Sequence, residues 1–116
     1  MSEDIFIGFE ERPKGLKKFL EEEGYVGIEK SRGSIIFSRN DDISTQVFYY
    51  PKAEAVEEDE VPNWAKSGHN ITSEVDINFH FTPYKDVEEA HRIADRVIGK
   101  YKGIRYDPNT DEFTEF

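Results

Sequence analysis

The chain has 116 residues, a net charge of −10 and no cysteine. This length suits one domain with a single core, and the missing cysteines exclude disulfides, thiolate metal sites and cysteine nucleophiles. The acidic balance opposes nonspecific binding to nucleic acid, because the phosphates would be repelled. We therefore expect a single domain over residues 1–116 without a nucleic-acid partner.

The sequence contains no recognisable secretion signal or membrane span. Met1-Ser2-Glu3-Asp4 is acidic where a signal peptide would be basic, and no apolar run approaches membrane-spanning length. We expect a cytoplasmic protein without a membrane partner.

The first half of the chain predicts four strands and one helix. Apolar side chains alternate over residues 4–9, as in a strand with one buried face. Pro13 precedes a helix that ends at Gly24. Three more strands follow, separated by tight turns that favour antiparallel pairing: residues 25–30, 34–39 and 43–50.

Residues 51–70 lack a strand or helix pattern and form a long acidic connection. The acidic run Glu57-Glu58-Asp59-Glu60 and Pro62 oppose an extended helix. A connection of this length in a compact domain is usually functional or mobile. It also carries Trp64, the only tryptophan, whose large ring predicts that the loop folds partly back onto the sheet.

The second half of the chain predicts a strand, a long helix and two short strands. Apolar and polar side chains alternate over residues 74–81. Pro83 then starts a helix whose apolar positions recur every three or four residues: Val87, Ala90, Ala94, Val97, Ile98 and Tyr101. Two strands are expected after Gly103, at residues 104–106 and 113–116.

Both ends of the chain read strand, helix, strand, strand. That repetition is similar to the ferredoxin-like sandwich and to related β-α-β-β duplications, a resemblance of architecture that no family motif accompanies. We predict an α+β fold, with two helices packed on one face of an antiparallel sheet of six or seven strands.

Large apolar side chains are predicted on both faces of this sheet. If the helices cover the face of Val47 and Phe79, the opposite face carries four of them: Phe6, Ile36, Phe48 and Tyr50. A group of this size is unusual on an exposed surface. We consider four kinds of cover: the loop that carries Trp64, a second copy of the chain, another partner or an apolar ligand.

The one basic cluster surrounds the start of the first helix, at Arg12, Lys14, Lys17 and Lys18. Cations beside free backbone donors would suit an anion. The pairs Lys17–Glu21 and Lys18–Glu22 also explain much of the pattern without a ligand.

Asp76 and His80 share the polar face of one strand and are the candidate ligands for a divalent metal. Their spacing along a strand is wide for one ion, and a solvated strand face is the favoured interpretation. The sequence predicts no catalytic residue and no cofactor.

The sequence favours a non-catalytic protein-binding or regulatory module that acts through the apolar sheet face and the 51–70 loop. Its partner would be another protein or a second copy of the chain. The alternative is a small-molecule-binding or metal-dependent enzyme domain with a pocket between that loop and the sheet. The familiar motifs of serine hydrolases, zinc proteases and phosphate-binding loops are missing from the sequence.

Overall fold

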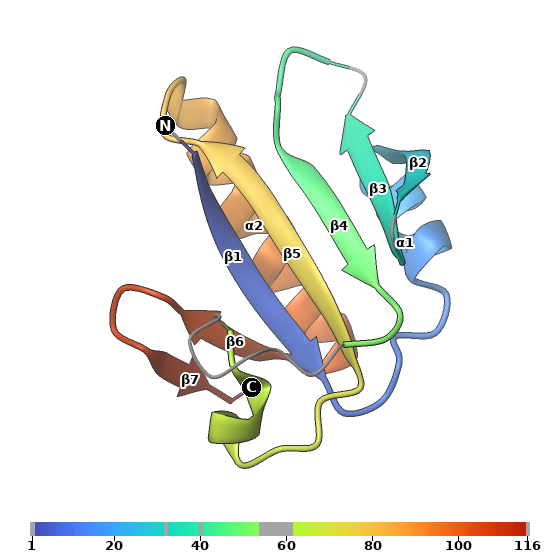
Figure 1. The fold of residues 1–116 in the computed structure, drawn as a ribbon. Helices are drawn as coiled ribbons and strands as arrows, with labels where there is room; N and C mark the ends of the chain where they lie inside the picture. The colour runs from blue at the N-terminus through green and yellow to red at the C-terminus, as the bar shows by residue number, and fades with distance from the viewer. Residues whose placement is uncertain (1, 32, 40, 54–61, 116) are drawn as a thin grey trace.

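Two strands that are far apart in the sequence pair at the centre of the fold (Figure 1). β1 (Ser2–Phe9) lies antiparallel to β5 (Ser73–His80), and Ile7 faces Val75 across the ladder. The apolar side chains of both strands are buried at alternate positions, as the sequence pattern predicts.

Five further strands complete a seven-stranded antiparallel sheet: β2 (Tyr25–Ser31), β3 (Ser34–Arg39), β4 (Gln46–Tyr50), β6 (Ile104–Asp107) and β7 (Glu112–Thr114). Their order across the sheet is β2-β3-β4-β5-β1-β6-β7. The predicted α+β class and antiparallel pairing are thus confirmed. This computed structural model describes residues 2–31, 33–39, 41–53 and 62–115.

Two α-helices contribute to the core, α1 (Leu16–Glu22) and α2 (Tyr84–Tyr101). In Figure 1, α2 runs behind β1 and β5. Buried side chains of both helices belong to one cluster with those of the strands, and the helical members are Leu16, Phe19, Leu20, Ala90, Ile93, Ala94 and Val97. In the described part of the chain, no helix has the length and apolar character needed to cross a membrane.

The strand predicted at residues 43–50 begins only at Gln46, because the residues before it bond to α2 instead. The backbone N–H of Ser44 donates to Oδ1 of Asp86 over 3.2 Å, and Oγ1 of Thr45 donates to the Asp86 carbonyl over 3.2 Å. Asp86 is 1% exposed, so these bonds satisfy buried polar groups at the start of α2.

A polar network ties the β2–β3 edge of the sheet to α2. The hydroxyl of Tyr25 donates to Glu89 over 2.7 Å, and Arg39 donates to the same carboxylate over 3.2 Å. Arg92 also donates to Glu89, over 2.7 Å. Burial opposes ionisation of Glu89, yet these donors and the nearby guanidinium charges hold its pKa below the ordinary value.

Corresponding strands of the two β-α-β-β segments occupy different places in the sheet. β6, which follows α2, lies beside β1, but β2, which follows α1, lies at the far edge of the sheet. β4 occupies the place beside β5. The strand predicted to reach Phe81 ends at His80, and Phe81 is 42% exposed beyond it.

Gly103, between α2 and β6, provides a test of how closely the chain packs against β1 at this point. A Cβ at this position would lie 2.4 Å from Cγ2 of Ile7 and 2.8 Å from Cε1 of Phe9. We expect Gly103→Ala to lower the free energy of unfolding by about 1–3 kcal/mol, because the core would be overpacked. Urea denaturation at pH 7 measures the change.

Gly99→Ala is the matched control, since a Cβ there meets nothing within 4 Å. It lies in the last turn of α2, where alanine should leave stability unchanged or raise it by up to about 1 kcal/mol. Equal losses in the two variants would contradict the close packing described here.

Candidate functional site

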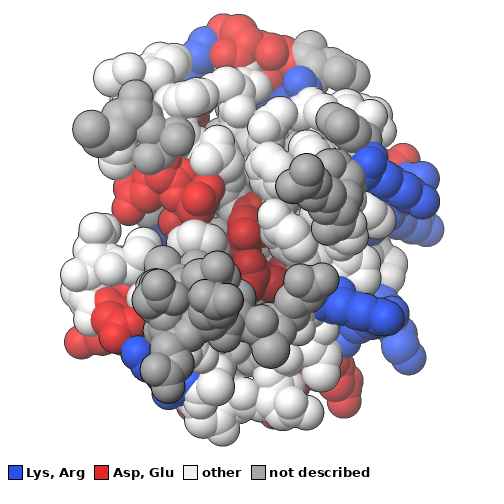
Figure 2. Space-filling view, in the orientation of Figure 1, with Lys and Arg blue, Asp and Glu red and all other residues white. Residues whose placement is uncertain are grey.

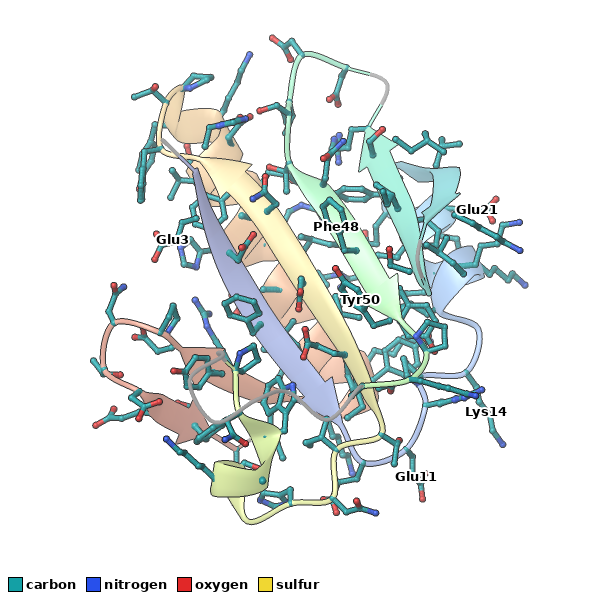
Figure 3. The ribbon with its side chains drawn as sticks, viewed as in Figure 1. Glu3, Glu11, Lys14, Glu21, Phe48 and Tyr50 are labelled. Carbon is teal, nitrogen blue, oxygen red and sulfur yellow. The ribbon has the colours of Figure 1, made fainter. Side chains whose placement is uncertain are left out.

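The face of the sheet opposite the main core carries a row of side chains that crosses four strands. The register pairs Ile36 with Phe48, Phe48 with Asp76, and Asp76 with Phe6. Directly paired residues share a face, so the row runs across β3, β4, β5 and β1. Tyr50 follows two residues after Phe48 on the same face, and Figure 3 shows both side chains on β4.

The predicted division of β4 between two faces is confirmed. Val47 is fully buried in the main core, and Tyr49 packs against the same cluster. Phe48 and Tyr50 therefore point to the other side of the sheet, as the alternation of a strand requires.

Trp64 covers one half of this second face, as the sequence predicts for its loop. It begins the 3₁₀-helix η1 (Trp64–Ser67) and is 7% exposed. It forms a small cluster over β1, β6 and β7, whose other members are Ile104, Tyr106, Phe6, Ile71 and Phe113. The ring lies against Gly8, where a Cβ would come within 3.0 Å of it.

The other half of the face, over β3 and β4, is less covered. Ile36, Phe48 and Tyr50 are half-buried, and among the described residues none of the three belongs to either apolar cluster. The acidic run predicted at 57–60 lies outside the described residues. We call Ile36, Phe48, Tyr50 and Asp76 the open sheet face.

Asp76 lies between two aromatic side chains, Phe48 and Phe6, at the centre of the row. Within the part of the chain that the structure describes, its Oδ1 atom is buried without a hydrogen-bond partner. Burial raises the pKa of Asp76 well above its usual range, and a hydrogen bond and repulsion from Glu74 raise it further. A neutral acid is therefore favoured here near pH 7.

Two neighbouring acids make this part of the face acidic. Glu74 accepts a hydrogen bond from the indole N–H of Trp64, and Asp4 accepts one of 2.8 Å from Nδ2 of Asn78. Burial raises the pKa of Tyr50, and the charges of these carboxyl groups and Asp76 add to that effect. Figure 2 shows acidic side chains in the middle of this face, with Lys and Arg at the right-hand edge of the view.

The predicted basic cluster divides into two parts. Arg12 and Lys14 line an open cavity together with Lys100 and Lys102 from the end of α2. Lys17 lines a different cavity beside β2, and both Lys17 and Lys18 are exposed on α1.

The residues predicted as metal ligands are separated on β5. Asp76 lies at the centre of the strand, whereas His80 is exposed at its end. Among the described residues, no group of three or more His, Asp or Glu side chains is arranged to hold a metal ion.

Two features of these sites are missing from the sequence predictions. The burial of Asp76 depends on which strands flank β5, and a period-two pattern does not reveal that order. Lys100 and Lys102 read as ordinary cations at a helix end. Because they are far in sequence from Arg12 and Lys14, the sequence does not indicate that all four side chains line one cavity.

The scan against protein-family models finds none that matches this chain, and the searches of curated proteins and of solved structures also find no match.

Asp76→Asn tests the state of the buried acid. The pKa of Asp76 is raised in the folded chain, so its contribution to stability is complete below the unfolded pKa of about 4 and is lost as the pH rises. Asparagine cannot ionise, and its amide can still donate to Glu74. We expect the variant to be more stable than the wild type at pH 8 by about 1–3 kcal/mol, since tenfold in proton affinity is worth about 1.4 kcal/mol and partial exposure weakens the effect.

Urea denaturation at pH 5 and pH 8 measures this difference, with Asp95→Asn as the control. Asp95 is exposed on α2, so its replacement should leave the pH dependence of the wild type unchanged. The same pH dependence in Asp76→Asn as in the wild type would show that the buried acid is ionised throughout.

Proposed function

We propose that this chain is a non-catalytic protein-binding module, and that the open sheet face receives a basic and apolar segment of another protein. The observation that carries the proposal is the buried, unpartnered Oδ1 of Asp76 among the described residues, set between aromatic side chains. A buried polar atom without a partner costs free energy, and a donor from a bound partner would recover it once the side chains over Oδ1 move aside.

A lysine or arginine of the partner matches the chemistry of this face. Its charge would favour the ionised form of Asp76 and be attracted by Glu74 and Asp4. Its aliphatic stem would pack on Phe48 and Tyr50, which are half-buried. A neighbouring apolar side chain would cover Ile36, so that recognition combines apolar burial with one charge-assisted hydrogen bond.

A partner of opposite charge suits this face better than a second copy of the chain. Two copies placed face to face would bring their acidic side chains together, and each copy has a net charge of −10. Like charges in an interface oppose association. The homodimer is therefore the second candidate rather than the first.

The proposal includes an inference about the architecture. We infer that both helices cover one face of the sheet, because their buried side chains belong to a single cluster with Ile5, Ile7 and Val47. The strand order β6-β1-β5, with α1 after β1 and α2 after β5, supports a ferredoxin-like core. The strands β2, β3 and β4 would then widen the sheet and supply the apolar part of the binding face. We keep a cytoplasmic location as part of this proposal.

The first test uses a peptide of alternating lysine and leucine as the probe, with a glutamate–leucine peptide of equal length for comparison. We expect the basic peptide to shift the amide resonances of residues 36, 48, 50 and 76 in two-dimensional NMR spectra. Phe48→Ser should weaken binding at least about tenfold by calorimetry, since a central aromatic hot spot is worth about 2 kcal/mol and tenfold corresponds to about 1.4 kcal/mol.

Tyr84→Ser is the matched control, because Tyr84 is 69% exposed at the start of α2, away from the open sheet face. Its affinity for the peptide should equal that of the wild type. Equal losses in both variants, or equal binding of the two peptides, would contradict the proposal.

Light scattering tests the homodimer directly. If the wild type is a dimer that Phe48→Glu converts to a monomer, the face binds a second copy of the chain and the proposed foreign partner is wrong. A monomeric wild type that binds the basic peptide supports the proposal.

A further inference from the structure

A second site lies outside the open sheet face, where the connection from β1 to α1 meets the end of α2. The structure contains an open cavity of about 620 Å³ at this junction. Its charged lining consists of Arg12 and Lys14 from the connection, Lys100 and Lys102 from the end of α2, and Glu11. Figure 3 places Lys14 and Glu11 in this connection, at the lower right of the view.

Tyr101 links the end of α2 both to the connection and to α1. The hydroxyl of Tyr101 donates to the carbonyl of Lys14 over 2.9 Å, and its ring meets Phe19 edge-on at 5.8 Å. The ammonium of Lys100 lies 5.4 Å from the centre of the Phe19 ring. These contacts fix the end of α2 beside the connection, so the cavity does not depend on a ligand for its shape.

The charge of the lining is opposite to that of the chain. Four cations and one carboxylate leave a net of +3 around the cavity, whereas the whole chain carries −10. Within the described ranges, no salt bridge joins any of the four cations to a carboxylate. All four cations are exposed, so water weakens their mutual repulsion, but an anion in the cavity would be attracted by all four at once.

The helix end explains only part of this arrangement. Cations are favourable at the negative end of α2, which accounts for Lys100 and Lys102. It does not account for Arg12 and Lys14, which reach the same cavity from a segment far away in sequence. Two segments far apart in sequence thus bring their cations to one cavity.

We propose that this cavity binds a compact anion that carries several phosphate groups. Its volume lies in the range of small-molecule sites. The guanidinium of Arg12 can form paired hydrogen bonds with a phosphate, and the lysines supply point charges for its neighbours. Such a group occurs both on free small molecules and on lipid headgroups. A long nucleic acid would be repelled by the charge of the whole chain.

The test measures binding of inorganic tripolyphosphate at low ionic strength by calorimetry. Vesicles of phosphatidylcholine with and without a phosphatidylinositol bisphosphate provide the lipid arm, measured by co-sedimentation. The double variant Lys14→Gln/Lys100→Gln removes one cation from each segment. The control Lys17→Gln/Lys18→Gln makes the same change in net charge on α1, outside the cavity lining.

We expect the Lys14→Gln/Lys100→Gln variant to bind the phosphate probe about tenfold more weakly than the wild type does. The affinity of the Lys17→Gln/Lys18→Gln variant should lie within about twofold of the wild-type value. NMR spectra of the wild type, which need no variant, should show shifts at residues 11–14 and 100–102. Tripolyphosphate binding alone assigns the site to free ligands, and vesicle binding alone assigns it to a headgroup.

Two results would overturn the proposal. One is the absence of binding to both probes at low ionic strength. The other is an equal loss of affinity in the two double variants. That result would mean that anion binding depends only on the net charge of the chain and not on this cavity. Neither result depends on the open sheet face, so a failure here leaves the proposed protein-binding function standing.

Discussion

The pairing of β1 with β5 is the constraint on which the rest of the structure depends. It places two long strands at the centre of one sheet and fixes which side chains point to each side. One side is filled by Ile5, Ile7 and their partners in the main core. The other side also carries apolar groups, so a second cover is required, and the Trp64 segment supplies it over β1, β6 and β7.

Among the described residues, Ile36, Phe48 and Tyr50 belong to neither apolar cluster, and they lie beside acidic side chains of β5. Asp76 is desolvated by the aromatic groups beside it, and Glu74 links it to the indole of Trp64. A carboxyl group in such surroundings gains most from an added donor. At the end of α2, by contrast, cations converge without carboxylate partners among the described residues. The acidic sheet face therefore suits a cationic ligand, whereas the basic cavity suits an anion.

Much of the fold could be predicted from local patterns, because each pattern reflects one element. Alternation identifies β1 and β5, and the apolar stripe identifies α2 up to Tyr101. The sequence does not reveal that β4 separates β2 and β3 from β5, since strand order depends on long-range pairing. It overestimates β4 because Ser44 and Thr45 bond to Asp86, which a propensity for strands cannot anticipate.

The candidate sites were less predictable for the same reason. Phe48 and Tyr50 could be assigned to a face by counting along β4, and Trp64 could be expected to cover part of that face. The burial of Asp76 without a partner for Oδ1 among the described residues could be predicted only if the two strands beside β5 were known. The basic cavity requires knowledge that Tyr101 holds α2 against the segment after β1.

The central ladder also limits how this protein can assemble while it is being made. In the sheet that the structure describes, β1 lies between β5 and β6, and these two strands begin only at Ser73 and Ile104. During synthesis, β1 therefore leaves the ribosome long before any strand that can bond to it. The three-stranded meander of β2, β3 and β4 can form early, but it joins β1 in one sheet only after residues 73–80 emerge. Such late, long-range pairing is typical of slow folding, and until then the apolar side chains of β1 lack the strands that pair with it in the folded sheet.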